Sequence, residues 1–423
     1  MKQEWWTGQT RFGVRPGLDR IRALLDCLGH PEARYPIVHV AGTNGKGSVA
    51  AMTAAALKAQ GWRTGLYVSP DLGRINERVW VDGAPLSERD WDMWAERIEA
   101  AGAGLTDMPT WFETVTTLAF LAFAESRVDI AVVEVGMGGR LDATNVIPPP
   151  MLSIITPVAY DHMRFLGTTI EAIAGEKAGI LKAGTELVLA RQSFSQARTV
   201  ILDAAQKRGV PVFEASPRAV LTADGPELVT EAGQRVRTAL LGAYQADNLD
   251  TAWTAIERLE THGWMTDLTA AAESLKTVQW PGRFQVLSTT PLIVVDGAHN
   301  PHGIAGVVNT LKSAPWNRRK WHVVFGVLGD KAWQEMLASI SPYVQAMTVT
   351  RVPGERGSDT GVLAKHVRGI PIRIVDDPVL AVAQASRDLE DGDALLVTGS
   401  LALLAYLRQR GVFDGGVVPV VDS

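Results

Sequence analysis

Short apolar runs rich in β-branched residues alternate along the chain with longer segments of helical periodicity. Strands that are apolar at consecutive positions are typical of parallel sheets covered by helices on both faces. The pattern therefore predicts an α/β fold. The runs that we interpret as strands in the first half are residues 36–40, 64–68, 130–135 and 152–155.

A second alternating series follows a passage rich in Pro, Gly and Thr, QWPGRFQVLSTTP, in which the element patterns fade. We predict a domain boundary there, with a larger domain over residues 1–287 and a smaller, Rossmann-like α/β domain over residues 288–423. The strands of the smaller domain are expected within LIVVDGAHN, WHVVFGVLGDK, AMTVTRV, IPIRIVDD and ALLVTGS.

Composition excludes several classes of protein. The 423 residues include 41 basic and 46 acidic side chains, for a net charge of −5, so no electrostatic feature favours nucleic acid. The single cysteine, Cys27, cannot form an internal disulfide, which favours a reducing compartment. Residues 1–13 lack an apolar signal-peptide core, and no run approaches the roughly 18 apolar residues of a spanning helix. We expect a cytoplasmic protein without membrane partners.

The segment HVAGTNGKGSVAAM, residues 39–52, joins the first predicted strand to an Ala-rich helix expected from Ser48 to about Gly61. It is close to the phosphate-binding pattern G-x-x-x-x-G-K-[ST], in which backbone amides surround phosphate oxygens. The spacing differs, because Val40 occupies the position of the leading glycine and Gly47 separates Lys46 from Ser48. The larger domain is therefore expected to be of the P-loop type.

Polar residues gather at the carboxyl ends of the predicted strands, where open α/β sheets bind their ligands. The loop of residues 39–48 follows the first strand, Ser69 the second, and Asp161 with His162 a later one, while Glu134 closes AVVEVG. A shared location of this kind predicts one common site.

Glu134 interrupts an apolar strand, where an unpaired carboxylate is costly, so a cation is expected beside it. One interpretation is an ion pair with a residue such as Arg140, and the other, which we favour, is a Mg²⁺ ligand. Ser69 and His162 are weaker candidates, because Ser-Pro often starts a turn and imidazole suits other divalent ions better.

Lys177 lies in TTIEAIAGEKAGILKAG, which opens with a possible capping box formed by Thr168 and Glu171. Helical spacing places Lys177 among apolar residues on one helix face. It either extends past that face to a surface carboxylate, or is desolvated with a lowered pKa and available for covalent chemistry. The residues that share the face are Ile170, Ile173, Ala174 and Lys177.

Two further motifs decide little alone. Residues 136–139, GMGG, resemble a dinucleotide fingerprint, but RLDATNVIPPP follows where a helix should begin. Asp296 and His299 in DGAHN fit either a catalytic dyad or a polar turn after a strand.

Taken together, the segments closely resemble the folylpolyglutamate synthase and dihydrofolate synthase family, which is related to the Mur ligases. They follow the order of the family along nearly the whole chain. The matching segments are AGTNGKGS, SPDLGRINERV, TWFETVT, VVEVGMGGRLDATN, DHMRFLGTTIEAIAGEKAGILK, QADN, WPGRF, DGAHNPHG and GDK. Family members usually carry His at the positions of Asp71 and Tyr244.

The resemblance implies ATP and two Mg²⁺ ions as cofactors, with a carbamylated lysine at Lys177. Catalytic roles are implied for Lys46, Lys177 and His162, and metal ligation for Ser69, Glu134 and His162. The implied nucleotide contacts are Thr43, Asn44, Gly45, Lys46, Gly47, Ser48, Asn248, Arg283, Asp296 and His299. The implied contacts of the pteridine-bearing substrate are Thr110, Trp111, Phe112, Glu113, Leu141, Asp142 and Ala143.

The expected activity is the ATP-dependent ligation of L-glutamate to dihydropteroate or a reduced folate through an acyl phosphate. A Mur-type ligase of UDP-linked substrates, a P-loop kinase or NTPase, and a nucleotide-gated binding protein are the alternatives. Because the family is commonly monomeric, a monomer is expected.

Overall fold

An eight-stranded sheet, ordered β4-β3-β2-β5-β1-β6-β7-β8, forms the centre of the first unit of the structure, a computed structural model that describes residues 15–413. This unit comprises the described residues up to Asp71 together with Ile75–Arg218 and Asp247–Val278. Its strands are β1 (Ile37–Ala41), β2 (Thr64–Tyr67), β3 (Val79–Val81), β4 (Ala84–Pro85), β5 (Ile130–Glu134), β6 (Leu152–Ile155), β7 (Glu186–Leu189) and β8 (Val212–Glu214).

The six strands from β2 to β8 in this order run parallel, and the hairpin of β3 and β4 adds an antiparallel edge. Every residue of β1, β5 and β6 is buried, as expected for central strands covered on both faces. The register pairs Val40 of β1 with Glu134 of β5, so the carboxyl ends of these two strands lie side by side.

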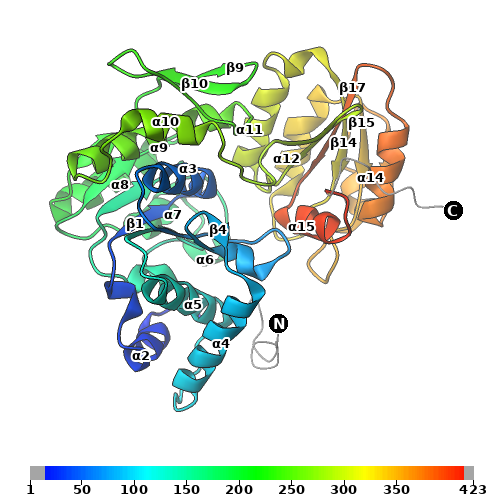
Figure 1. Cartoon of the computed structure of the whole chain (residues 1–423). Helices are drawn as coiled ribbons and strands as arrows, with labels where there is room; N and C mark the ends of the chain where they lie inside the picture. The colour runs from blue at the N-terminus through cyan, green and yellow to red at the C-terminus, as the bar shows by residue number, and fades with distance from the viewer. Residues whose placement is uncertain (1–14, 414–423) are drawn as a thin grey trace. The chain divides into compact units, whose positions relative to one another are not determined.

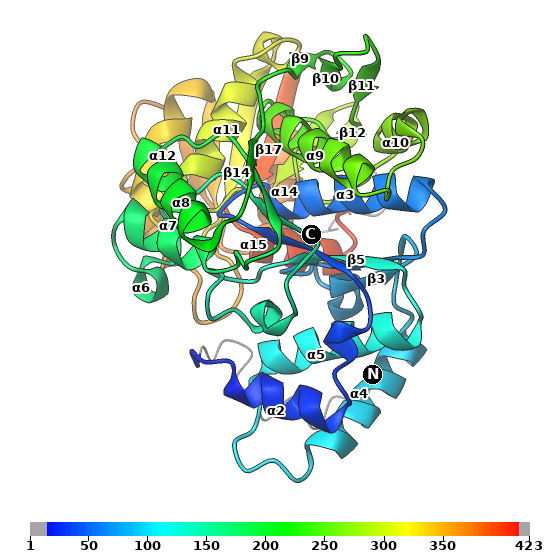
Figure 2. The same ribbon diagram turned by 90° about the vertical axis from the view of Figure 1, so that its left-hand side faces the viewer.

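Helices cover both faces of this sheet, with α3 on one face and α5 on the other (Figures 1 and 2). On the α5 side, residues of α2, α4 and α5 form one apolar cluster with β1, β2 and β5, and α7 and α8 form another with β6 and β7. The helices are α2 (Asp19–Cys27), α3 (Lys46–Ala59), α4 (Glu88–Gly102), α5 (Trp111–Glu125), α6 (Met163–Leu166), α7 (Ile170–Ala178), α8 (Ser195–Arg208), α9 (Tyr244–Thr261) and α10 (Leu268–Leu275). Of these, α9 begins in the second unit and enters the first unit at Asp247.

The second unit contains two sheets and comprises Leu72–Arg74, Ala219–Ala246 and the described residues from Gln279. In its six-stranded sheet, ordered β12-β13-β17-β14-β15-β16, only the edge strand β12 is antiparallel. The strands are β12 (Gln285–Thr289), β13 (Leu292–Asp296), β14 (Lys320–Phe325), β15 (Ala346–Val349), β16 (Ile372–Ile374) and β17 (Asp393–Thr398). A separate antiparallel sheet contains β9 (Val220–Thr222), β10 (Gly225–Val229) and β11 (Arg235–Arg237).

The six-stranded sheet lies between two helical layers (Figure 1). Residues of α11 and α12 pack on one face, and residues of α14 and α15 pack on the other. The helices are α11 (Pro301–Leu311), α12 (Trp333–Ile340), α13 (Thr360–Ala364), α14 (Pro378–Arg387) and α15 (Leu401–Gln409). Short 3₁₀ helices in the two units span Pro31–Ala33, Ile75–Arg78, Ala143–Val146, Trp316–Arg318 and Ser341–Tyr343.

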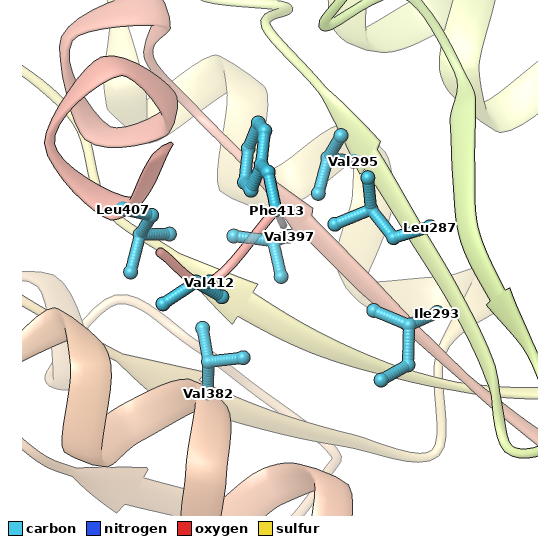
Figure 3. Close-up of a pocket in the computed structure, with 8 residues that line it drawn as sticks. All are labelled: Leu287, Ile293, Val295, Val382, Val397, Leu407, Val412 and Phe413. Atoms are coloured by element: carbon cyan, nitrogen blue, oxygen red, sulfur yellow. The ribbon is translucent and has the colours of Figure 1, made fainter. Parts of the chain in front are cut away.

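A cavity of about 10 Å³ lies between this sheet and α14 and α15, and Figure 3 shows the residues that line it. An apolar space that admits at most about one water molecule stays dry, so this cavity is a packing defect of the core rather than a ligand site. Its lining residues are Leu287, Ile293, Val295, Val382, Val397, Leu407, Val412 and Phe413.

The predicted α/β class is confirmed, and each predicted strand is present within one residue at either end in the first unit. The units are not contiguous in sequence, however. The predicted boundary at 287 and 288 lies inside β12, and Leu72–Arg74 and Ala219–Ala246 also belong to the second unit. Hydrophobic periodicity reports local structure, so it does not show where a loop packs.

Within the described part of the chain, none of the helices has the length and apolarity needed to cross a membrane. Residues 1–13, on which the prediction about a signal peptide rests, lie outside the described residues.

Gly399, directly after β17, has a φ of 110°, and a Cβ added there would lie 2.6 Å from the carbonyl oxygen of Gly326. We expect Gly399→Ala to lower the free energy of unfolding by about 3 kcal/mol, because a backbone clash adds to the strain of the left-handed region. Urea denaturation measures this loss. Gly392→Ala is the matched control, since Gly392 has a φ of 89° but no atom within 4 Å of the added Cβ. Equal losses in the two variants would contradict the clash.

Candidate functional site

The loop between β1 and α3 is shaped to receive an anion. Gly45 is the N-cap of α3 with a φ of 90°, and no side chain caps this 14-residue helix. A Cβ on Gly45 would lie 2.2 Å from Oδ1 of Asn248, so the glycine allows Asn248 of α9 to approach the loop. A helix N-terminus that has no side-chain cap directs backbone amides and the positive end of its dipole toward a ligand.

Hydrogen bonds to the segment after β6 fix the rest of the loop. The amide of Thr43 donates to the carbonyl of Pro157 (2.9 Å), and its hydroxyl both donates to the carbonyl of Ala159 and accepts from the Ala159 amide. Gly47 and Ser48 are buried in the first turn of α3, while Asn44 is half-buried. The segment after β6 therefore fixes the loop and leaves the start of α3 to face a ligand.

Glu134, at the end of β5, is 4% exposed. Its Oε2 accepts a hydrogen bond from the amide of Ser69 at 3.2 Å, and its Oε1 lies 3.7 Å from Nζ of Lys46. An ion pair therefore does form at Glu134, but its partner is Lys46 and not Arg140, whose guanidinium donates to Oε1 of Glu176 at 2.8 Å. Arg140 follows the strand end by several residues, and the loop carries it to α7. The Mg²⁺ ligand that we favoured stays a prediction.

Lys177 lies with Ile170, Ile173 and Ala174 on the buried face of α7, as the spacing predicts. Its Nζ donates to the carbonyl of Gly42 at 2.7 Å. Burial, followed by repulsion from the Lys46 ammonium, lowers the pKa of Lys177 from 10.5 to about 7. The predicted burial of this lysine is therefore confirmed, and the extended surface interpretation is wrong. Its availability for covalent chemistry stays a prediction.

The helix that carries Lys177 begins one residue later than predicted. Its N-cap is Thr169, whose hydroxyl accepts from the amide of Ala172, so the capping box of Thr168 and Glu171 is wrong. Adjacent threonines are chemically equivalent N-cap candidates, and the backbone conformation decides between them.

His162 lies in the loop after β6, where it is the N-cap of α6 with a φ of 50°. Its side chain is exposed, and its amide donates to Oδ1 of Asp161 at 2.8 Å. The negative charge of Asp161 also acts on Lys177, so this loop faces the same region. No group of three or more His, Cys, Asp or Glu side chains with metal-site spacing occurs among residues 15–413. The metal ligands that we predict, Ser69, Glu134 and His162, are not such a group, because one of them is a serine hydroxyl.

The predicted substrate residues lie at the start of α5 and in the loop after β5. Thr110 and Glu113 form a capping box. The Glu113 carboxylate also accepts a hydrogen bond from Nε of Arg20 at 3.1 Å. Trp111 is buried, and the ring of Phe112 lies against Gly136.

In the loop after β5, Leu141 is exposed and Ala143 is buried. Asp142 accepts hydrogen bonds from the amides of Thr144 (3.0 Å) and Met137 (2.8 Å) and from the Thr144 hydroxyl (2.6 Å). Burial raises the pKa of Asp142.

His39 is a buried residue of β1 to which the sequence assigned no role. Its Nε2 lies 2.9 Å from Oγ1 of Thr144, which links β1 to Asp142. Burial, with a smaller effect from Lys182, lowers the pKa of His39 to about 3, so the imidazole is neutral. A single polar residue inside the run IVHVA was the available signal.

In the second unit, Asp296 closes β13 and is 2% exposed. Its carboxylate accepts from the Tyr244 hydroxyl at 2.5 Å and from the amides of Phe284 and Ala298, both at 2.8 Å. Burial raises its pKa despite these donors and the charge of Arg283.

His299 and Arg283 lie close to this strand end and are both half-buried. Nδ1 of His299 lies 2.9 Å from the carbonyl of Gly297, and Arg283 donates to the carbonyl of Gly282. The predicted nucleotide residues thus form two groups, one in each unit.

The chain is similar to known ligases over nearly its whole length. Residues 40–256 match the Mur ligase middle domain, and residues 282–401 match the Mur ligase glutamate ligase domain. The dihydrofolate synthase/folylpolyglutamate synthase of Bacillus subtilis is 34% identical over 426 residues, which cover 96% of this chain and 98% of that protein.

Solved structures of the same kind of ligase are also similar to this chain. Escherichia coli FolC in complex with DHPP and ADP superposes with a TM-score of 0.87 at 29% identity, covering 96% of each chain. A bifunctional folylpolyglutamate synthase/dihydrofolate synthase with Mn, AMPPNP and L-glutamate bound gives 0.83 at 31% identity, covering 96% of this chain and 97% of that one.

The lowered pKa of Lys177 predicts a dependence of stability on pH. Above pH 7 the native amine is neutral, whereas the unfolded lysine stays protonated up to about pH 10.5, so the unfolded state binds more protons. The free energy of unfolding of the wild type should therefore rise with pH relative to Lys177→Met, by up to about 1.4 kcal/mol per pH unit. Urea denaturation at pH 7, 8 and 9 in CO₂-depleted buffer measures the difference. Parallel pH profiles would contradict the lowered pKa.

Proposed function

Because the chain belongs to the folylpolyglutamate synthase/dihydrofolate synthase family of Mur ligases, we propose that it ligates L-glutamate to a folate-type carboxylate at the expense of ATP. The observation that carries the proposal is the arrangement at the start of α3. A helix N-terminus without a side-chain cap, the Lys46 amine and the buried Glu134 carboxylate occupy one strand-end site. The helix N-terminus and the Lys46 amine can bind phosphate groups, and the Glu134 carboxylate can bind a divalent cation.

ATP binding is assigned to residues of both units. From the first unit, the proposed contacts to the phosphates are Thr43–Ser48, with Asn248 beside the glycine turn. From the second unit, Arg283, Asp296 and His299 are assigned to the nucleotide. Relatives with ADP or AMPPNP bound support a nucleotide in this family.

Glu134, Ser69 and His162 are the residues that would hold a divalent cation, for which we propose Mg²⁺ and two ions. The carboxylate and the hydroxyl are hard oxygen ligands, and Glu134 is buried at the strand end beside the phosphate loop, so this donor set fits the ion. A bound Mg²⁺ would supply positive charge to offset that of the phosphates. The Mn bound in a relative supports a divalent ion.

In the proposed reaction, a carboxylate oxygen of the folate substrate attacks the γ-phosphorus of ATP, and the bond to the β-phosphate oxygen breaks to leave ADP. The amino group of L-glutamate then attacks the resulting acyl phosphate, loses a proton and displaces inorganic phosphate. Lys46 offsets charge on the transferring phosphoryl group, which is chiefly an electrostatic and positioning task. The folate subsite is assigned to Thr110–Glu113 and Leu141–Ala143.

Lys177 is proposed to be carbamylated. A neutral lysine amine attacks CO₂ and loses one proton, which gives an anionic carbamate. The buried position of Nζ and its pKa of about 7 support this step, because much of the amine is neutral at physiological pH. The cytoplasmic location and the monomeric state remain predictions.

The proposed activity is tested by measuring ADP release with ATP and Mg²⁺. We expect release to require both L-glutamate and either dihydropteroate or a reduced folate. Release without L-glutamate would indicate an NTPase or kinase, and a requirement for a UDP-linked substrate would indicate a Mur-type ligase. Nucleotide binding without turnover would indicate a binding protein, and each of these outcomes contradicts the proposal.

Matched lysine variants provide the control for this assay. Lys46→Ala should lower kcat by a factor of about 10³ with the fold intact, because a charge-stabilising donor is lost. Lys58 lies on the same helix but donates to the carbonyl of Asp82, so Lys58→Ala should keep its activity. Equal activity in the two variants would refute the role of Lys46.

The carbamate generates its own prediction. Lys177→Ala should lose nearly all ligase activity, and short carboxylates such as acetate should restore part of it by replacing the missing anion. The same carboxylates should leave Lys46→Ala inactive. Full activity of Lys177→Ala without additives would show that no carbamate is needed.

A further inference from the structure

The loop between β2 and β3 contains a buried ion pair that the proposed mechanism does not use. Nε of Arg78 donates to Oδ2 of Asp71 at 2.7 Å, and the two side chains are 7% and 4% exposed. Because a buried charge is stable only when it is paired, each of these residues fixes the position of the other.

Arg78 also contacts the predicted folate subsite. Its guanidinium carbon lies 4.8 Å from the ring centroid of Trp111, the first residue of α5. The planar guanidinium thus donates to a carboxylate through Nε and lies over an indole ring, an arrangement that suits arginine better than lysine. Asp71 consequently acts on Trp111 through Arg78.

The same loop contacts the phosphate side of the site. Two residues before Asp71, the amide of Ser69 donates to Glu134. Residues Leu72–Arg74 then belong to the second unit, where Leu72 is buried in the apolar cluster of Ile293 and Leu404. The chain returns to the first unit at Ile75, and the 3₁₀ helix Ile75–Arg78 leads into β3. The Asp71–Arg78 ion pair therefore joins the two ends of the segment that includes Leu72–Arg74.

We propose that Asp71 is a positioning residue for the folate subsite, which holds Trp111 at the start of α5 through the guanidinium of Arg78. This inference rests on the proposed function, since it assigns Trp111 to the folate substrate. The pair fixes the start of α5 relative to the loop that contacts Glu134. The carboxylate of a bound substrate is thereby positioned toward the phosphate site.

The test is Asp71→Asn, which keeps the shape of the side chain and removes its charge. The KM for dihydropteroate or the reduced folate should rise about tenfold, as expected when a charge-assisted hydrogen bond is lost. The KM for ATP and kcat at saturating folate should change by less than about twofold. Arg78→Lys is the second variant, because it keeps the charge but loses the planar stack, and it should give the same rise in KM.

Glu257→Gln is the matched control, since it removes the carboxylate that pairs with Arg218 at 2.8 Å in the same unit, and neither residue is assigned to ATP, the metal or the folate. It should leave both KM values unchanged. A double variant of Asp71→Asn and Trp111→Phe should raise the folate KM less than the product of the single effects, because the two residues act through one contact.

Unchanged folate KM in Asp71→Asn and Arg78→Lys, equal rises in the KM for ATP and folate, or multiplicative effects in the double variant would each overturn the proposal. Wild-type protein distinguishes this failure from failure of the proposed function. If the wild type shows glutamate-dependent ADP release, the ligase function stands whatever the variants show. If it does not, the proposed function itself fails.

Discussion

The burial of one negative charge organises the site. A carboxylate removed from water must gain donors that replace its hydration, and Glu134 gains the Lys46 amine and the Ser69 amide. These three groups end or follow β5, β1 and β2, which are adjacent in the sheet although far apart in sequence. The strand order therefore creates the site, because parallel strands bring their carboxyl ends to one edge.

A second constraint is the presence of two lysines in one small region. Lys46 lies beside Glu134, whereas Lys177 is buried against the carbonyl of Gly42 and is repelled by Lys46. Burial favours the neutral amine of Lys177, and repulsion from Lys46 adds to this effect, although the charges of Asp161, Asp142 and Glu176 oppose it. The two lysines therefore differ in their surroundings, and the phosphate contact proposed for Lys46 and the carbamate proposed for Lys177 rest on that difference.

The sequence predicted most of the parallel strands because each is a continuous apolar run, and it predicted the face of Lys177 from helical spacing. The predicted N-cap is wrong because Thr168 and Thr169 are equivalent candidates, and the structure selects Thr169. The predicted ion-pair partner of Arg140 is wrong because the path of a loop brings this residue to Glu176. The link from His39 through Thr144 to Asp142 joins residues about a hundred positions apart, and no local pattern contains it. The division of the chain into discontinuous units is likewise a property of packing alone.

The two carboxylates in the predicted folate subsite are already committed to the protein. Glu113 caps its own helix and pairs with Arg20, and Asp142 accepts from two amides and a hydroxyl of its own loop. Groups with that many internal donors stabilise the shape of the subsite. In the proposed folate subsite, contact with a pteridine is then assigned to the apolar side chains, of which Leu141 is exposed, Phe112 is half-buried and Trp111 is buried. The effect that we propose for the Asp71–Arg78 pair on the KM for folate follows from the same reasoning, because Arg78 lies over the ring of Trp111 and Asp71 fixes Arg78.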